Sequence, residues 1–313
     1  MQFLKEKKIL VYGAGAVGSY YGGMLVKAGY DVTFIAREKH FQALKKKGLT
    51  LIRDKQKENI PIKVFDNIKS LSNFDYIFIC VKSIDTKIVA LDIQNIISTN
   101  TTVVSLQNGV ENEEVITNVI GKKPVIGGLV FVAAKIIEPG IVYQSGYNGG
   151  LIGELDFTKS QRVDDLYKIF QSAEIDVKIA DDINSELWNK LVWNASFNSI
   201  SVLTGKTVDK MLEEDYELIK DVMTEVKNVA VALKINVRPD TVEFNLNRSK
   251  GFTGFKTSML QDYERGKPLE IEELVGVVIR KAKENNISVP NIQNVYTKLK
   301  SKVSDCMEEG LKQ

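Results

Sequence analysis

The sequence predicts an α/β protein in which an N-terminal Rossmann-type, doubly wound sheet precedes a C-terminal all-helical domain. Three observations indicate this fold class. Short β-branched runs alternate with segments of helical period in the first half of the chain, a glycine-rich turn directly follows the first run, and beyond residue 180 the period is almost wholly helical. We therefore expect one domain over residues 1–180 and a second over residues 181–313, with a boundary that rests on the change of period alone.

The expected elements follow in order along the chain. Strands are expected at 8–12, 31–35, 76–81 and 101–106, a β-rich stretch at 124–153, a helix at 161–173 and a last strand at 176–180. Helices of the second domain are expected at 187–202, 212–233, 271–282 and 295–303. Strands that alternate with helices in this way form a largely parallel sheet.

Composition narrows the classes of function. The chain has 42 Lys and Arg residues against 40 Asp and Glu, and a net charge of +2 is too small to indicate a nucleic-acid-binding or membrane-surface protein. A small molecule is therefore the expected partner, and neither a monomer nor a homodimer is excluded. The N-terminus lacks the long apolar region of a signal peptide and no stretch is long enough to span a bilayer, so we expect a cytoplasmic protein.

Cysteine and histidine are scarce, and this limits the chemistry. Cys80 and Cys306 lie far apart in the sequence, without the spacing of a metal site or of a disulfide framework, and no metal is expected. His40 is the only histidine, and we expect it at the surface of a helix near residues 38–47. Another residue must therefore transfer protons.

The glycine-rich turn predicts a dinucleotide site. It reads Gly13-Ala14-Gly15-Ala16-Val17-Gly18, and residues 19–28 after it favour a helix. Gly13 permits the tight turn, Gly15 lets the backbone approach a pyrophosphate and Gly18 allows close packing of the helix on the strand. The alternative is a glycine-rich turn that binds no ligand. The position of the motif between a strand and a helix disfavours this alternative.

The end of the second strand predicts which cofactor is bound. Many NAD-binding enzymes present a carboxylate there, but this chain has Ala36-Arg37. A guanidinium matches the oxygens of a 2′-phosphate, so the sequence favours NADP(H). The alternative is that Arg37 is an ordinary solvated charge at the start of the next helix.

Two further strand ends carry polar residues. Lys82 and Ser83 follow the strand at 76–81, and Asn108 and Gly109 follow the strand at 101–106. Ligands collect at the carboxyl ends of parallel strands, and an asparagine offers both donors and an acceptor. Simple turn chemistry is the other interpretation of both places.

The expected helix at 187–202 carries a polar stripe. Lys190, Asn194 and Asn198 are spaced i, i+4 and i+8, among apolar neighbours. A lysine in such surroundings has a lowered pKa and donates a proton to a developing alkoxide. A stripe that only contacts the other domain explains the same pattern.

Together these residues resemble the ketopantoate reductase (2-dehydropantoate 2-reductase) family along nearly the whole chain. The matching elements are the glycine-rich turn, Arg37, Val81-Lys82, Gln107-Asn108-Gly109-Val110, the stripe from Lys190 to Asn198, and Thr257-Ser258-Met259-Leu260-Gln261-Asp262. The resemblance implies NADPH-dependent reduction of 2-dehydropantoate to (R)-pantoate, a step of pantothenate synthesis.

The resemblance also implies roles for single residues. Lys190 would protonate the substrate carbonyl as hydride arrives from the nicotinamide, and Glu270 would help to close the site. Substrate contacts are implied for Asn108, Lys190, Asn194, Asn198 and Ser258. Cofactor contacts are implied for Lys82, Asn108, Ala134 and Glu270.

The chain departs from the family pattern on the substrate side. Leu269-Glu270-Ile271-Glu272 stands where the family has Thr-Glu-Ile-Asp, Val275-Gly276 replaces an Asn-Gly, and Val208 replaces an asparagine of some members. These departures leave two alternatives open. One is a reductase of another branched 2-oxo acid or 3-hydroxy acid, and the other is a non-catalytic dinucleotide-binding sensor.

Overall fold

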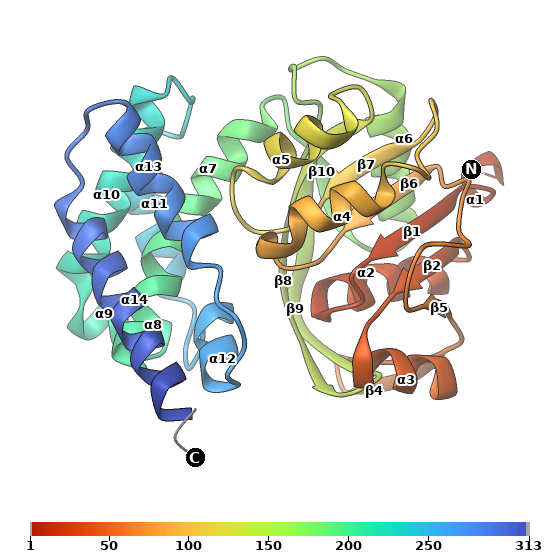
Figure 1. The fold of residues 1–313 in the computed structure, drawn as a ribbon, viewed down its shortest axis with the longest axis horizontal. Coiled ribbons are helices and arrows are strands. Elements are labelled where there is room, and N and C mark those ends of the chain that lie inside the picture. The colour runs from red at the N-terminus through yellow and green to blue at the C-terminus, as the bar shows by residue number, and fades with distance from the viewer. Residues whose placement is uncertain (1, 311–313) are drawn as a thin grey trace. The chain divides into compact units, whose positions relative to one another are not determined.

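The structure, a computed structural model, describes the backbone of residues 2–310 and the side chains of residues 4–304. By its internal contacts the chain divides into two compact units (Figure 1). The first, the sheet unit, runs to Gln107 and resumes over Asn112–Ile183; the second, the helical unit, consists of Asn108–Glu111 and the chain from Asn184 onward. The predicted fold class, an N-terminal sheet with helices and a helical C-terminal region, is confirmed.

The sheet unit is built on a mostly parallel sheet. The strands within the described residues are β1 (Lys8–Tyr12), β2 (Asp31–Ile35), β3 (Leu49–Arg53), β4 (Gln56–Ile60), β5 (Lys63–Phe65), β6 (Tyr76–Ile79), β7 (Thr102–Ser105), β8 (Val125–Glu138), β9 (Ile141–Gly153) and β10 (Asp176–Ile179). Their order is β4-β3-β9-β8-β7-β6-β1-β2-β5, and β10 also pairs with β9. The pairs from β5 to β8 are parallel, whereas β8–β9 and β3–β4 are antiparallel.

Helices cover both faces of this sheet. They are α1 (Gln2–Lys5), α2 (Ala16–Lys27), α3 (Glu38–Lys47), the 3₁₀ turn η1 (Ser83–Asp85), α4 (Thr86–Ile93), α5 (Asn112–Ile120) and α6 (Gln161–Ser172). Ile9 and Val11 of β1 belong to the apolar cluster that contains α2 and α6, whereas Leu10 and Tyr12 belong to the cluster that contains α4 and α5. Alternate residues of one strand therefore face opposite helical layers, as in a doubly wound sheet.

The expected strands coincide with β1, β2, β6 and β7, but β3, β4 and β5 lie in a stretch where the sequence analysis assigns no strand. β3 and β4 form a hairpin whose two turn residues, Asp54 and Lys55, have φ of 49° and 66°. This turn is usually marked by Asn-Gly or Asp-Gly, and β4 is exposed except at Ile60, so neither turn chemistry nor alternation of apolar residues reveals the hairpin.

The helical unit contains no strand among its described residues. Its elements are α7 (Ile183–Trp193), the π-helical turn η2 (Asn194–Asn198), α8 (Ser199–Thr204), α9 (Val208–Glu214), α10 (Tyr216–Ala232), α11 (Thr241–Ser249), α12 (Ser258–Glu264), the π-helical turn η3 (Glu272–Gly276), α13 (Val277–Glu284) and α14 (Pro290–Gly310). None of the described helices is both long and apolar enough to cross a membrane.

A single apolar core holds the helical unit together. Val208 and Val275 are both 0% exposed and belong to this core. An apolar side chain is the favourable choice at a fully buried position, so both valines suit their surroundings.

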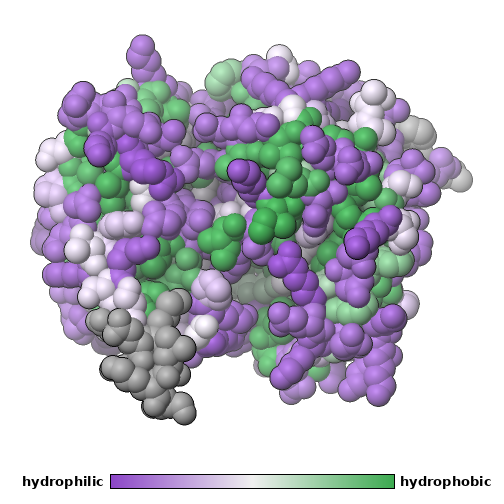
Figure 2. All heavy atoms as spheres, in the orientation of Figure 1, coloured by the Kyte–Doolittle hydropathy of each residue, from purple (hydrophilic) through white to green (hydrophobic). Residues whose placement is uncertain are grey.

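An apolar stripe of the sheet unit reaches the surface over α4 (Figure 2). Ile84, Ile88 and Leu91 follow helical spacing and are 43%, 55% and 50% exposed. Exposed hydrophobic side chains that share one face are less common than scattered ones.

Candidate functional site

The glycine-rich turn joins β1 to α2 as the sequence predicts. Gly13 has a φ of 102°, and a Cβ atom on it would lie 2.8 Å from the backbone nitrogen of Val81. A Cβ on Gly18 would lie 2.2 Å from the carbonyl oxygen of Gly13. Both positions therefore require glycine for steric reasons within the protein itself.

Gly15 differs from its two neighbours in the motif. It precedes the first residue of α2, and a Cβ on it would meet no protein atom within 4 Å. Nothing in the protein requires a glycine here, so the open space suits the approach of a ligand. The amide groups at the start of α2 make this space favourable for a phosphate, and a dinucleotide pyrophosphate fits the residues present.

Hydrogen bonds join the glycine-rich turn to the end of β2. The amides of Gly13 and Ala14 donate to the carbonyl of Ile35 at 3.2 and 2.8 Å, and the hydroxyl of Ser19 donates to the carbonyl of Ala14 at 2.9 Å. Arg37, two residues beyond Ile35, is therefore held at the same edge of the sheet as the glycine-rich turn.

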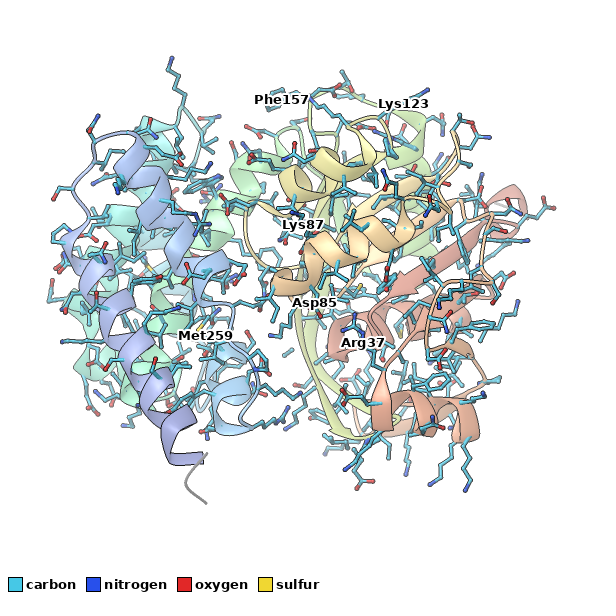
Figure 3. All side chains as sticks on the ribbon, viewed as in Figure 1. Arg37, Asp85, Lys87, Lys123, Phe157 and Met259 are labelled. Carbon is cyan, nitrogen blue, oxygen red and sulfur yellow. The ribbon has the colours of Figure 1, made fainter. Side chains whose placement is uncertain are left out.

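Arg37 has an acidic neighbour in the fold that its position in the sequence does not reveal. Its Nη1 atom lies 3.3 Å from Oδ2 of Asp85 (Figure 3), and the two side chains are 55% and 32% exposed. An exposed ion pair of this kind contributes at most about 1 kcal/mol, so a phosphate can displace the carboxylate.

Lys82 stands at the end of β6, next to the glycine-rich turn. It precedes η1 and is half-buried. The buried amide of Gln107 ties this end of β6 to the end of β7, because its Nε2 donates to the carbonyl of Val81 at 3.1 Å and to Oγ1 of Thr86 at 2.8 Å. The residue before Asn108 thus orders the sheet edge on which Lys82 lies.

Asn108 itself belongs to the helical unit. The next residue, Gly109, has a φ of 106°, which side-chain-bearing residues rarely adopt. Glu111 accepts a hydrogen bond from Nη2 of Arg280 at 2.7 Å, and Val110 packs on the helical core. The loop after β7 is therefore held by α13, and Asn108 lies in the same unit as Lys190.

Ala134 lies on β8 of the sheet unit, opposite Gln144 of β9. The register of this antiparallel pair shifts between Val132 and Ala133, which marks a β-bulge. A bulge redirects the backbone beside it, and bulges are common next to binding sites.

The helix that carries Lys190 is not a continuous α-helix. Asn194–Asn198 form the π-helical turn η2, so the expected i, i+4, i+8 stripe is interrupted after Asn194. A second π-helical turn, η3, follows Glu270, and the two turns contact each other. Such turns are rare and occur frequently at functional sites, so their presence near Lys190 and Glu270 favours a functional site there.

Lys190 and Glu270 interact in the helical unit. Burial, together with the nearby charge of Arg248, lowers the pKa of Lys190 to about 8, while the charge of Glu270 opposes this shift. Glu270 is 5% exposed. The arrangement can hold a proton near neutral pH and release it to a substrate oxygen.

The remaining residues of the predicted substrate site lie in η2 or on α12, which contacts it. Asn194 and Asn198 are buried, and Oδ1 of Asn198 has no hydrogen-bond partner among the described residues. Ser258 is exposed at the start of α12, which packs against η2, and Thr257 before it caps this helix by accepting from the amide of Leu260 at 3.2 Å.

The sequence analysis did not predict two residues that interact with the predicted site residues. Asp85 and Arg248 lie far in sequence from their partners Arg37 and Lys190, and no local pattern marks them. Among the predicted residues, His40 is half-buried rather than free at the surface, because its Nδ1 accepts from the amide of Gly140 at 3.1 Å.

Cys80 is a free thiol whose pKa burial raises to about 12, and the side chain of Cys306 lies outside the described residues. No group of three or more His, Cys, Asp or Glu side chains that could hold a metal ion occurs in the described part of the chain.

Comparison with known proteins matches both parts of the chain. A family model described as ketopantoate reductase PanE/ApbA matches residues 9–156, and one described as the C-terminal part of the same family matches residues 182–303. The 2-dehydropantoate 2-reductase of Nostoc sp. is 28% identical, with 95% of each chain covered. The enzyme of that name from Pyrococcus horikoshii is 32% identical, over 95% of this chain and 98% of its own.

A solved structure is similar as well. The crystal structure of a PanE/ApbA family ketopantoate reductase from Ralstonia eutropha has a TM-score of 0.89 and 30% identity, and the match covers 95% of this chain and 99% of that chain.

Proposed function

The chain belongs to the ketopantoate reductase family, and on this premise we propose that it reduces 2-dehydropantoate to (R)-pantoate with NADPH as the cofactor. The observation that carries the proposal is the pair of Lys190 and Glu270, in which the pKa of the half-buried lysine is lowered to about 8. A group with this pKa is a suitable acid at neutral pH. A non-catalytic sensor would need neither residue.

Different residues of the chain donate the proton and hold the substrate. Lys190 donates a proton to the oxygen on C2 of the substrate, and the negative charge of Glu270 keeps Lys190 protonated. Asn108, Asn194, Asn198 and Ser258 hold the substrate by hydrogen bonds from amide and hydroxyl groups. NADPH, when bound, supplies the hydride that makes the reaction a reduction.

Binding of the cofactor is assigned mainly to residues 1–180 and binding of the substrate mainly to residues 181–313. The space at Gly15 takes the pyrophosphate, Arg37 takes the 2′-phosphate, and Lys82, Asn108, Glu270 and the backbone at Ala134 make further contacts. Lys82 is half-buried and follows Val81, whose backbone nitrogen lies beside Gly13 of the glycine-rich turn. A cytoplasmic location stays a prediction.

Oxidation of NADPH at 340 nm with ketopantoate as substrate tests the proposal. We expect saturable turnover that depends on Lys190, with (R)-pantoate as the product. Turnover of other branched 2-oxo acids without turnover of ketopantoate would assign a different substrate. Binding of NADPH without turnover of any oxo acid would favour the sensor.

A further inference from the structure

The strongest unassigned feature of the helical unit is a second cation next to Lys190. Arg248 is the penultimate residue of α11, and two side-chain hydrogen bonds join this helix to α7. The amide of Asn245 donates to the carbonyl of Asn189 at 3.5 Å, and Nε1 of Trp193 donates to Oγ of Ser249 at 2.9 Å. These two bonds bring the turn that carries Arg248 to the turn that carries Lys190.

The two charges interact. The charge of Arg248 is one of the causes that lower the pKa of Lys190, and burial lowers the pKa of Arg248 itself. The side chain of Arg248 nevertheless remains exposed, and its guanidinium lies 6.0 Å from the ring of Phe244. A guanidinium that has lost part of its water but is still accessible binds an anion more strongly than a fully solvated one.

We propose that Arg248 binds the carboxylate of the 2-oxo acid and thereby selects acids over neutral carbonyl compounds; this inference rests on the proposed function. In a 2-oxo acid the carboxylate is bonded to the carbon that is reduced, so both groups fit beside adjacent cations. Lys190 takes the ketone oxygen, and the planar fork of Arg248 takes the two carboxylate oxygens. The carboxylate also offsets the repulsion between the two cations.

The chain offers a matched control. Arg238 lies over the same ring of Phe244, at 4.0 Å, and its Nη2 is paired with Asp240 at 3.1 Å. It is not among the charges that shift the pKa of Lys190. Replacement of Arg238 therefore removes a similar cation from the same aromatic ring without changing the charge at Lys190.

Steady-state kinetics with ketopantoate and with its lactone, which has the ketone but no carboxylate, test the proposal. Arg248→Met should raise KM for ketopantoate about ten- to a hundredfold and leave KM for the lactone nearly unchanged. Arg238→Met should change neither. Equal losses on both substrates would overturn the proposal, because they would indicate a structural role for Arg248.

The alkaline limb of kcat/KM gives a second measurement. Because Arg248 lowers the pKa of Lys190, Arg248→Met should move this limb to higher pH, whereas Arg248→Lys should leave it in place and recover part of the affinity. An unmoved limb in Arg248→Met, together with an unchanged KM, would refute the inference.

Failure of the proposed function is distinguishable from failure of this inference. If the wild-type protein reduces neither compound, calorimetric titration with ketopantoate still measures the role of Arg248. Binding that Arg248→Met abolishes and Arg238→Met preserves would keep the inference without the reductase activity, and binding that is insensitive to Arg248→Met would reject it.

Discussion

Arg37 shows how one side chain depends on its neighbours in space. In the sequence the end of the second strand reads Ala36-Arg37 without the expected carboxylate, but in the fold Asp85 is 3.3 Å from the guanidinium of Arg37. A 2′-phosphate must displace this carboxylate and lie near its negative charge. We therefore expect cofactor choice to depend on two residues, of which Arg37 favours the phosphate and Asp85 opposes it.

We expect opposite effects from the two residues. Arg37→Ala should weaken NADPH binding by about one to two orders of magnitude and leave NADH nearly unchanged, since charge-assisted hydrogen bonds contribute about 1.5 to 3 kcal/mol. Asp85→Asn should strengthen NADPH about two- to fivefold. Fluorescence titration measures both. Equal losses of NADPH and NADH in Arg37→Ala would show that Arg37 does not bind the phosphate.

Lys190 is the second residue whose behaviour depends on its surroundings. With a pKa of about 8, it is protonated at neutral pH and loses its proton as the pH rises above that value. Activity that needs the acid form should therefore fall on the alkaline side. Lys190→Ala should lower kcat about 10²- to 10⁴-fold with little change in NADPH affinity.

Lys190→Arg separates charge from proton transfer. Arginine keeps the positive charge, but its pKa is too high for ready release of a proton, so kcat should stay low even where substrate binding is partly retained. The pH profiles of both variants should lack the alkaline limb. A Lys190→Ala enzyme with near wild-type kcat would assign the acid to another residue.

At the scale of elements, α2 shows two different uses of glycine. Gly18 is surrounded by protein, with the carbonyl oxygen of Gly13 2.2 Å from where a Cβ would lie, whereas Gly15 faces open space. The first glycine serves the packing of α2 on β1, and we assign the second to the cofactor.

Two substitutions distinguish these uses. Gly15→Val should leave the fold and its thermal stability nearly unchanged but abolish binding of either cofactor, because the side chain fills the space beside the start of α2. Gly18→Ala should destabilise the protein by about 1–3 kcal/mol or more, because the added methyl meets backbone. Circular dichroism with temperature and a binding titration measure both. Normal NADPH affinity in a folded Gly15→Val protein would contradict the assignment.

α5 begins with a buried acid. Glu113 is 6% exposed, its carboxylate oxygens have no hydrogen-bond partner among the described residues, and burial raises the pKa of this carboxyl to about 7. The nearby backbone amides of Glu113 and Gly128 lower the pKa, but less than burial raises it. The folded protein therefore holds a proton here that the unfolded chain releases at lower pH.

This acid should make stability depend on pH. Because the folded pKa lies above the unfolded value, the folded state loses stability as the pH rises from about 4.5 to 7, by about 3 kcal/mol at most. Glu113→Gln should therefore raise the melting temperature at pH 8 more than at pH 5. Equal melting temperatures for the variant and the wild type at pH 8 would show that ionisation of Glu113 does not destabilise the folded protein.

At the scale of the whole molecule, two separate apolar clusters cover the faces of the sheet and a third forms the core of the helical unit. The glycine-rich turn and Arg37 belong to the sheet unit, whereas Lys190, Glu270 and Arg248 belong to the helical unit. A ligand that binds only one unit stabilises that unit directly.

NADPH should accordingly stabilise the folded protein, chiefly through the sheet unit, which holds most of its proposed contacts. At a concentration one hundred times its Kd, a ligand that binds only the folded state adds about 2.7 kcal/mol to the free energy of unfolding. Differential scanning calorimetry should show a higher melting temperature with NADPH than with the same concentration of NADH, and no shift in Gly15→Val. A larger shift with NADH would reverse the assignment of the cofactor.

The sequence by itself determined the features that depend on neighbouring residues. The alternation of short strands and helices, the glycine-rich turn and the expected strands at 8–12 and 31–35 are local patterns, and the structure has them in place. Motifs in the order of the family also predicted ketopantoate reductase membership, which the comparisons confirm.

Only the tertiary structure decided the features that depend on distant residues. The hairpin at Asp54 and Lys55, the interruption of the lysine helix by η2, the ion pair of Arg37 with Asp85 and the charge of Arg248 beside Lys190 have no local signal. The physical reason is that side-chain charge and burial act through space, so residues far apart in the chain set the protonation of a group once folding brings them together.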